Sequence, residues 1–355
     1  MKIAFIIPSL INQGPVIVVN TIIKFLIDKV EQIEVYYFDD KKGIGFVCPT
    51  HKIRMDTPID FDKYDIIHSH MYRPDKYVNK WRAKIKRAKT VTTIHQDIFQ
   101  NLKYSYNFFV AIVFGYIWKG FIRKMDMVIV ISKKLYNLYE KKMKQLLVVH
   151  NGVDISINEQ DADPEISGAI KRLSEKGYKI IGTYAAITKR KGIDQLITLL
   201  KIRNDIGLVI IGEGVEKEKL IANVKKNGWD DRVLFFPYLK EPYNYIRDFD
   251  VYAMPNRSEG FGLAIAEAAL TKIPVVCSDI DVFKEIFDET EATFFKLENI
   301  QSLSDSINLA FKLGQAKTEK AYNKIMTHFS AQVMADNYLR LYKRMLNDNR
   351  LNRNL

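Results

Sequence analysis

Short apolar runs alternate with amphipathic stretches along most of this 355-residue chain. The runs are typical of buried strands, and the stretches between them, such as residues 16–30, are typical of helices. Strands and helices that alternate in this way form a parallel sheet with helices on both faces. The predicted strands are residues 2–7, 34–38, 65–68, 90–94, 127–131 and 146–149, then 179–183, 207–211, 232–236, 251–254 and 274–277.

The alternation pauses at residues 158–168, where the sequence NEQDADPEISG is polar and holds few large apolar side chains. We interpret this segment as a linker. The chain is long enough for two domains of roughly 100–200 residues each. We therefore predict an α/β fold with two Rossmann-like domains, residues 1–157 and 169–330, facing each other across a cleft that holds the ligands. Apolar residues recur at helical spacing near the C-terminus, so a helix within residues 331–355 is expected to pack back on the first domain.

The charge of the chain is unevenly distributed. Residues 1–150 hold 25 Lys and Arg and 13 Asp and Glu, a net charge of +12, whereas residues 151–355 hold 29 of each and are neutral. A one-sided basic excess favours an anionic partner, either a membrane or a nucleic acid. The two cysteines, Cys48 and Cys277, lie in different halves and form neither a disulfide framework nor a metal-binding spacing.

Aromatic side chains gather among basic residues in the segment 99–125. This mixture favours the headgroup region of a membrane. The apolar run 108–118 is too short to span a bilayer, and a buried helix is the alternative explanation. The aromatic residues are Tyr104, Tyr106, Phe108, Phe109, Phe114, Tyr116, Trp118 and Phe121.

The most specific local signal is residues 256–268, which follow a predicted strand and open a helix. Two glycines allow a tight turn and a close approach of the backbone to a ligand. The helix N-terminus at Gly262 and Leu263 leaves N–H groups and a partial positive charge that suit a phosphate. Glu259 before the helix and Glu267 within it can accept hydrogen bonds from hydroxyl groups at two points of one ligand.

With these residues the chain resembles the family-4 retaining glycosyltransferases of GT-B fold, of the kind that assembles bacterial polysaccharides. Residues 258–267 are similar to the Glu-x7-Glu motif of that family. Further similar stretches follow in the family's order: residues 12–15, 65–70, 93–97, 130–132, 151–154, 191–194, 212–214, and 329–330 with Tyr338 and Tyr342.

The chain departs from the family pattern at two places. Ala186 stands where the family usually has an arginine, five residues before Lys191. Lys189 or Arg190 is a candidate to supply that charge. The first loop holds Gly14 followed by a proline, which has no N–H to donate, where the family has adjacent glycines.

The resemblance implies transfer of a sugar from a nucleotide-sugar, with retention at the anomeric carbon. It gives catalytic roles to Glu259, which would hold sugar hydroxyls, to His95, which would contact the sugar or pass a proton, and to Lys191, which would stabilise the departing diphosphate. The C-terminal domain would bind the nucleotide-sugar and the N-terminal domain the acceptor. The implied donor-binding residues are Gly14, Arg190, Lys191, Gly260, Phe261, Gly262, Leu263 and Glu267, the last on the ribose.

We expect a UDP-hexose or UDP-N-acetylhexosamine donor, with GDP-mannose second, and a glycan or lipid-linked acceptor presented at an anionic membrane. The expected location is the cytoplasm, peripherally on the inner face of the cell membrane, with no nucleic acid as partner. On the reading that the sequence holds no Asp-x-Asp metal-binding motif, we expect a metal-independent reaction without a cofactor. We also expect His68 and His70 to point to opposite faces of their strand, which argues against a metal pair.

Three other functions stay open on the sequence. A nucleotide-sugar epimerase of GT-B fold would need no second substrate. A non-catalytic sugar-binding relative would accommodate Ala186. A basic nucleic-acid-binding protein would use the positive first half, but it leaves the two glutamates of residues 256–268 unexplained.

Overall fold

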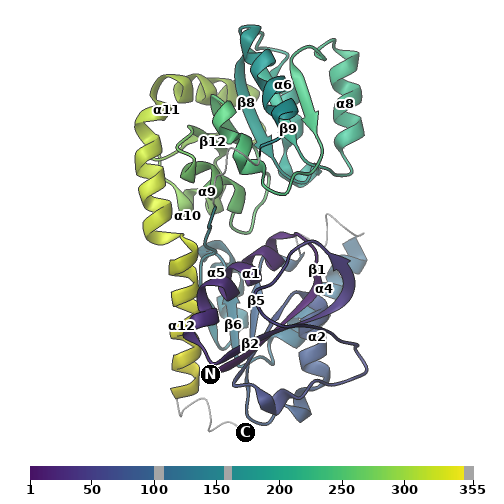
Figure 1. Cartoon of the computed structure of the whole chain (residues 1–355). Coiled ribbons are helices and arrows are strands. Elements are labelled where there is room, and N and C mark those ends of the chain that lie inside the picture. Colours follow the sequence, from purple (N-terminus) through teal and green to yellow (C-terminus); the bar gives the residue numbers. More distant parts are fainter. Residues whose placement is uncertain (100–107, 156–161, 348–355) are drawn as a thin grey trace. The chain divides into compact units, whose positions relative to one another are not determined.

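The structure is a computed structural model and describes residues 1–99, 108–155 and 162–347. The chain forms two compact units, Met1–Gly152 joined by the C-terminal segment from Phe329, and Val153–His328. We call them unit 1 and unit 2. Each unit contains one parallel sheet with helices packed on it (Figure 1). The predicted architecture of two α/β domains with parallel sheets is therefore confirmed.

The sheet of unit 1 has seven strands in the order β3-β2-β1-β4-β5-β6-β7. Its central strands are buried on both faces, which explains their continuous apolar sequences. The strands are β1 (Lys2–Leu10), β2 (Gln32–Lys42), β3 (Thr50–Lys52), β4 (Ile66–His70), β5 (Lys89–Ile94), β6 (Met127–Val130) and β7 (Leu146–Val148). The helices are α1 (Gly14–Leu26), α2 (Tyr72–Lys80), α4 (Phe108–Ile122), α5 (Lys133–Tyr139) and α12 (Ala331–Asn347).

The C-terminal helix α12 belongs to unit 1 and packs against α1. The hydroxyl of Tyr342 on α12 lies 2.7 Å from Nδ1 of His68 on β4. The N–H of Gly152, where the chain leaves unit 1, donates to Sδ of Met334 at 3.0 Å. The end of the first domain and the returning helix are thus joined directly within one unit.

The sheet of unit 2 has six strands in the order β10-β9-β8-β11-β12-β13. The strands are β8 (Lys179–Tyr184), β9 (Ile206–Ile211), β10 (Val233–Phe236), β11 (Val251–Met254), β12 (Val275–Ser278) and β13 (Thr293–Phe295). The helices are α6 (Pro164–Glu175), α7 (Ile193–Leu199), α8 (Lys217–Lys226), α9 (Leu263–Leu270), α10 (Asp281–Ile286) and α11 (Ile300–His328). The core is aliphatic, with Ile181, Leu208 and Val251 fully buried at its centre.

Both sheets reverse their strand order at one point, which lies between β1 and β4 in unit 1 and between β8 and β11 in unit 2. In open parallel sheets, ligands bind at the carboxyl ends of the strands beside this point. The loops that follow β8 and β11 are therefore the expected place for a site in unit 2.

The predicted linker over residues 158–168 is wrong in its second part. Helix α6 begins at Pro164, and the side chain of Asp163 caps it by accepting the N–H of Glu165 at 2.8 Å. Aspartate at the cap and proline in the first turn are signals of a helix start. Residues 156–161 lie outside the described part, and the boundary between the units falls between Gly152 and Val153.

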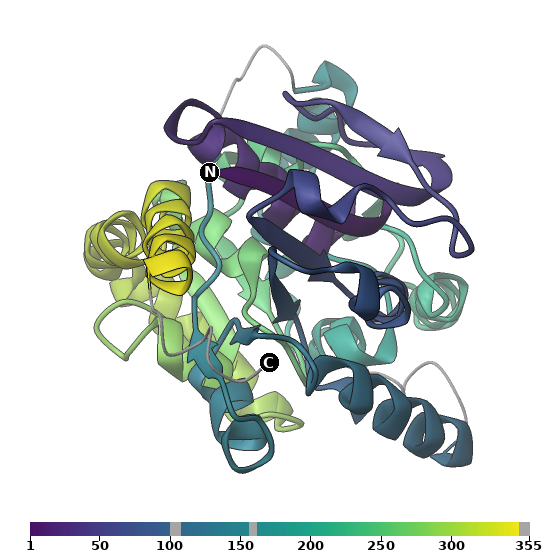
Figure 2. The ribbon, with the colours of Figure 1, turned by 90° about the horizontal axis from the view of Figure 1, so that it is seen from below.

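In the described parts of the chain, no helix is both long enough and apolar enough to cross a membrane. The most apolar helix, α4, lies at the outer edge of unit 1 (Figure 2). Trp118 on α4 is buried and donates its indole N–H to Asp75 on α2 at 2.6 Å. Trp118 is thus a core residue and not the interfacial anchor that we predicted.

Candidate functional site

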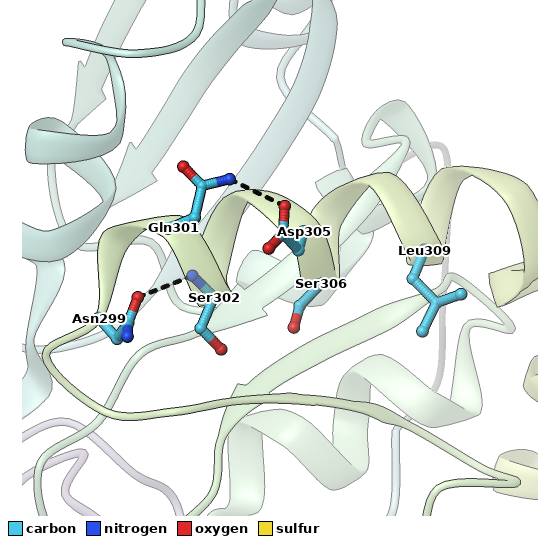
Figure 3. A pocket seen from close by; sticks show the side chains of 6 residues that line it. All are labelled: Asn299, Gln301, Ser302, Asp305, Ser306 and Leu309. Carbon is cyan, nitrogen blue, oxygen red and sulfur yellow. Dashed lines mark hydrogen bonds between the residues drawn. The ribbon is translucent and has the colours of Figure 1, made fainter.

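A shallow hollow on unit 2 lies over the start of α11 (Figure 3). Its polar side chains bond around the start of the helix: Oγ of Ser302 accepts the N–H of Lys296 at 2.9 Å, and Oγ of Ser306 donates to the carbonyl oxygen of Phe294 on β13 at 2.8 Å. Asn299 accepts the N–H of Ser302, and Gln301 donates to Asp305, both at 2.9 Å. This arrangement caps a helix and brings no catalytic groups together.

The loops after β8 and β11 meet at the point where the strand order of unit 2 reverses. Gly192 ends the turn Lys189–Lys191 with φ +67°, and a Cβ there would lie 2.0 Å from the carbonyl oxygen of Pro255. Gly262 caps α9 with φ +102°. Only glycine adopts such conformations without strain, so the two glycines allow the loops to approach each other closely.

Glu259 lies at the centre of these loops, with its side chain 13% exposed. Its Oε2 forms an ion pair with Nζ of Lys191 and accepts Nδ2 of Asn256 at 2.7 Å. Its Oε1 lies 3.3 Å from Nη1 of Arg190 and accepts the N–H of Gly260 at 3.1 Å. The carboxylate is thus held by four donors from two loops.

Charge decides the ionisation of this cluster. Burial raises the pKa of Glu259, but the charges of Lys191 and Arg190 outweigh it and lower that pKa to about 2. Burial also lowers the pKa of Lys191, and the neighbouring Glu259 opposes that change. Two cations and one anion leave a net charge of about +1, which suits an anionic ligand.

The structure places Arg190, and not Lys189, beside Glu259. Arg190 also donates to the carbonyl oxygen of Ser258 at 3.0 Å. Lys189 is exposed and pairs instead with Asp194 at 3.0 Å. Ala186, at the position of the family's arginine, is exposed and contributes no charge.

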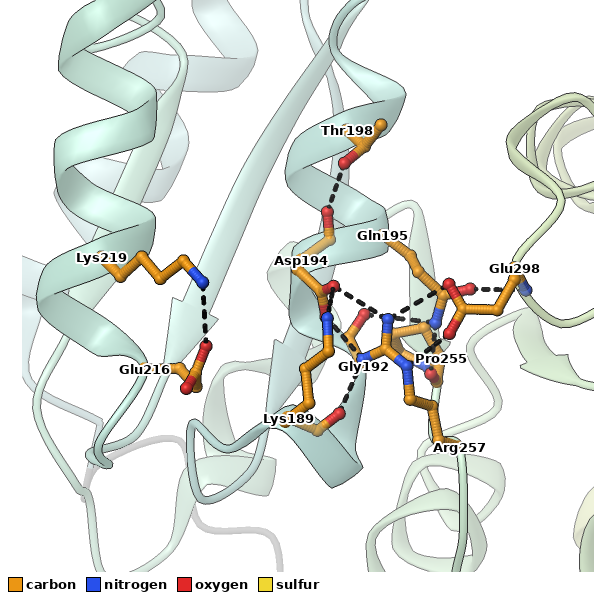
Figure 4. A network of polar contacts seen from close by, with 10 residues as sticks. All are labelled: Lys189, Gly192, Asp194, Gln195, Thr198, Glu216, Lys219, Pro255, Arg257 and Glu298. Carbon is orange, nitrogen blue, oxygen red and sulfur yellow. Dashed lines mark hydrogen bonds and ion pairs between the residues drawn. The ribbon is translucent and has the colours of Figure 1, made fainter.

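A second network holds the turn Lys189–Lys191 against the loop after β11 (Figure 4). Arg257 makes two parallel hydrogen bonds to Asp194, at 2.7 and 2.8 Å, and also pairs with Glu298. It donates further to the carbonyl oxygen of Lys189 at 2.6 Å, and its own N–H donates to the carbonyl oxygen of Arg190 at 2.9 Å. Paired guanidinium–carboxylate bonds are strong and directional. Arg257 therefore holds Arg190 and Lys191 in place beside Glu259.

Glu267 projects from α9, and its Oε2 accepts the hydroxyl of Tyr184 on β8 at 2.6 Å. Burial raises the pKa of Glu267, and the hydrogen bond from Tyr184 opposes that rise. Leu263, at the first turn of α9, is partly exposed, whereas Phe261 is buried with 2% of its surface exposed. The side chain of Phe261 therefore packs in the interior of unit 2.

The sequence did not single out Tyr184, Asn256 or Arg257. Tyr184 has no sequence signal beyond its place directly after the predicted strand 179–183. Arg257 and Asn256 lie inside the motif, but their partners come from other loops, so their roles depend on the tertiary fold.

His95 and Gly14 lie in unit 1. His95 follows β5, and its Nε2 lies 2.8 Å from Nδ1 of His70 on β4. Burial lowers the pKa of His95 to about 3, so the ring is neutral near pH 7. Gly14 begins α1 after the loop of β1, is exposed, and a Cβ there would meet no atom within 4 Å. Nothing around Gly14 requires glycine.

The expectation that His68 and His70 point to opposite faces is wrong. Side chains two residues apart on a strand share a face, and the two ring centroids lie 4.2 Å apart. His68 bonds Tyr342 and Thr93 through its two ring nitrogens. In the described part of the chain, Nε2 of His70 is buried without a hydrogen-bond partner.

The premise for a metal-independent reaction is also wrong, because the chain holds four Asp-x-Asp sequences, at residues 60–62, 161–163, 248–250 and 279–281. Asp161 lies outside the described residues. Asp250 accepts the N–H of Ile180 at 2.7 Å, and Asp279 accepts that of Leu297 at 3.2 Å. Within residues 1–99, 108–155 and 162–347, no group of three or more His, Cys, Asp or Glu residues could hold a metal ion.

Comparisons with known proteins agree with this geometry. The family described as "Glycosyl transferases group 1" matches residues 169–327, and "Glycosyltransferase Family 4" matches residues 32–157. The O-antigen biosynthesis glycosyltransferase WclY of Escherichia coli is 32% identical over 98% of this chain and 99% of its own.

Among solved structures, Anabaena HepE in complex with UDP and glucose has a TM-score of 0.80 at 18% identity, covering 97% of this chain and 99% of its own. Sucrose-phosphate synthase from Thermosynechococcus elongatus has a TM-score of 0.78 at 17% identity, covering 97% of this chain and 98% of its own. These similarities show the GT-B fold. Two family models match this chain, and a relative is similar to it over nearly its full length. Together with the two parallel-sheet units, these matches show that this chain belongs to the GT-B glycosyltransferases.

Proposed function

We propose that this protein transfers a sugar from a UDP-sugar to a glycan or lipid-linked acceptor in the assembly of a cell-surface polysaccharide, with retention at the anomeric carbon. One observation carries the proposal: Glu259 is buried against Lys191 and Arg190 where the strand order of unit 2 reverses. The similarity to an O-antigen glycosyltransferase over nearly the whole chain supports the polysaccharide acceptor.

The charges of this cluster suit the departure of a nucleoside diphosphate. As the bond between the anomeric carbon and the diphosphate breaks, negative charge grows on the leaving oxygen, while the acceptor oxygen forms the new bond. Lys191 and Arg190 are fixed positive groups that stabilise this charge without rearrangement. Glu259 holds the sugar and Glu267 the ribose. His95, neutral near pH 7, contacts the sugar or helps to pass a proton.

For the donor we propose a UDP-hexose or UDP-N-acetylhexosamine. HepE, of the same fold, was solved with UDP and glucose. We also propose that transfer needs no metal ion, because the two protein cations beside Glu259 can supply the positive charge that a metal ion would otherwise bring to the diphosphate. Unchanged turnover in excess EDTA supports this proposal, and loss of turnover that Mg²⁺ or Mn²⁺ restores contradicts it.

We further propose that α4 binds an anionic membrane, which would place the protein peripherally on the inner face of the cell membrane. One face of α4 is buried, and the other exposes four apolar side chains: Val113, Phe114, Tyr116 and Ile117. Arg123 and Lys124 follow the helix and are exposed. An apolar face beside basic residues suits the interface of an anionic bilayer. Tyr104 and Tyr106 lie outside the described residues.

The function is tested by incubating the protein with a panel of UDP- and GDP-sugars, with and without a lipid-linked acceptor, and identifying the products. Release of UDP from one donor, together with a glycosylated acceptor, supports the proposal. An isomerised nucleotide-sugar with no acceptor product indicates the epimerase. Binding of a donor without any turnover indicates a non-catalytic sugar-binding relative, and absence of both binding and turnover with every donor contradicts the proposal.

A further inference from the structure

Tyr184 joins two elements that are distant in sequence. It is the last residue of β8, it is buried with 8% of its surface exposed, and its hydroxyl lies 2.6 Å from Oε2 of Glu267 on α9. The carbonyl oxygen of Ala264, one turn earlier on α9, lies 3.2 Å from the same hydroxyl. Because one hydroxyl has one proton, the shorter, charge-assisted bond to the carboxylate dominates.

The surroundings of Tyr184 keep this hydroxyl in place. Its ring packs against the ring of Tyr252 on β11, with centroids 5.2 Å apart. The hydroxyl of Tyr252 donates to the backbone oxygen of Tyr184 at 3.4 Å and not to Glu267. Two strands beside the reversal point therefore hold a rigid donor against the carboxylate.

Among the residues that the structure describes, Glu267 has no cationic partner. Within the described residues, its side chain accepts a hydrogen bond from Tyr184 and from no other group, so Oε1 stays available for the hydroxyls of a ligand. This contrasts with Glu259, which is held by two cations and two further donors. The orientation of the Glu267 carboxylate depends on one phenol.

We propose that Tyr184 is a positioning residue, which orients the Glu267 carboxylate so that it binds the vicinal hydroxyls of the nucleotide's ribose. The inference rests on the proposed function, in which Glu267 contacts that ribose. It adds a residue that lies outside the motif, at the end of β8.

The proposal predicts a change in the pH dependence of nucleotide binding. Two titratable groups near the Glu267 carboxylate are Tyr184 on β8 and Tyr252 on β11; burial raises the pKa of both, so both are neutral near pH 7. Tyr243, in the 3₁₀ turn before β11, acts electrostatically on Tyr184, and the charged Glu259 acts on Tyr252. Burial raises the pKa of Glu267, and the Tyr184 hydrogen bond opposes that rise. Removing the hydroxyl therefore raises this pKa further, and nucleotide affinity should begin to fall at a higher pH.

The experiment compares the binding of UDP and of 2′-deoxy-UDP by calorimetry to the wild-type protein, Tyr184→Phe, Glu267→Ala and Tyr252→Phe. We expect the wild type to prefer UDP by about tenfold, since a hydrogen bond to a charged group contributes about 1.5–3 kcal/mol. Glu267→Ala should abolish the preference, and Tyr184→Phe should reduce it severalfold and shift the pH profile upward. Tyr252→Phe, the matched control, should keep both the wild-type preference for UDP and the wild-type pH profile.

The outcomes separate the inference from the function on which it rests. If the wild type binds UDP and Glu267→Ala loses the preference, but Tyr184→Phe keeps the wild-type preference and pH profile, the positioning role is wrong. If the wild type binds no UDP, or Glu267→Ala binds both ligands like the wild type, the proposed ribose contact is wrong. Circular dichroism checks that each variant is folded. If Tyr184→Phe does not fold, Tyr184→Leu takes its place.

Discussion

Nζ of Lys191 forms an ion pair with Oε2 of Glu259, and the two side chains are 14% and 13% exposed. A buried pair of this kind is stabilising only because other groups satisfy it. Asn256, Gly260 and Arg190 complete the set. The pair therefore holds in place two charged groups to which the proposed transfer reaction gives a role.

Replacing Lys191 with alanine should lower kcat/KM for the preferred donor by about 10²-fold, the usual cost of removing one group that stabilises developing charge. Lys189→Ala is the matched control, because Lys189 is two residues away, exposed, and paired with Asp194. Steady-state release of UDP measures both variants. Equal losses in the two would show that the turn tolerates no change, and not that Lys191 acts on the diphosphate.

Replacing Glu259 with glutamine leaves two cations without their anion. We expect a lower melting temperature, since an unpaired buried charge typically costs 3–5 kcal/mol, reduced here by the partial exposure of Arg190. Bound UDP supplies the missing negative charge, so it should raise the melting temperature of this variant more than that of the wild type. Thermal unfolding with and without UDP checks this, and an equal or smaller rise in the variant contradicts it.

The lowered pKa of Glu259 also predicts a dependence of stability on pH. Because the pKa in the folded protein is about 2, below the ordinary value of 4.5, the ionised group stabilises the fold above about pH 4.5. That contribution, on the order of 3 kcal/mol, is lost as the pH falls from about 4.5 to about 2. The difference in unfolding free energy between the wild type and Glu259→Gln should therefore shrink between pH 6 and pH 3. A constant difference in denaturant titrations would argue against the charged pair.

The exposed face of α4 predicts binding to anionic vesicles. Phe114→Ser and Ile117→Ser should each weaken binding to mixed phosphatidylglycerol–phosphatidylcholine vesicles by roughly tenfold, given about 1.5–3 kcal/mol for burying such a side chain. Leu309→Ser on α11 is the control, since it is 41% exposed, close to the 45% and 43% of the two α4 residues. Vesicle sedimentation measures the partition, and unchanged binding of the α4 variants would rule out this surface.

Much of the fold could be predicted because buried strands leave continuous apolar runs in the sequence. The strands that escaped detection are β3 and β13, of three residues each; β3 is exposed and polar, so it lacks that signal. The start of α6 was misread as a linker because its first turn is polar, although Asp163 and Pro164 mark a helix start.

The site was predictable where its residues are adjacent in sequence and hidden where the fold joins them. Glu259, Gly260 and Glu267 belong to one motif, and the structure brings Lys191 and Arg190 to Glu259. Tyr184 and Arg257 act through partners more than 60 residues away, which no local pattern encodes. The side-by-side rings of His68 and His70 follow from strand geometry, which we applied wrongly to the sequence.

The most direct test of the central claim is the rate of UDP release from the preferred donor by the wild type, Glu259→Gln and Glu319→Gln. Glu319 forms a surface ion pair with Lys272 in the same unit and controls for the loss of a carboxylate. We predict that Glu259→Gln loses at least about 10²-fold in kcat while Glu319→Gln matches the wild type. Full activity of Glu259→Gln would contradict the assignment of this cluster as the catalytic site.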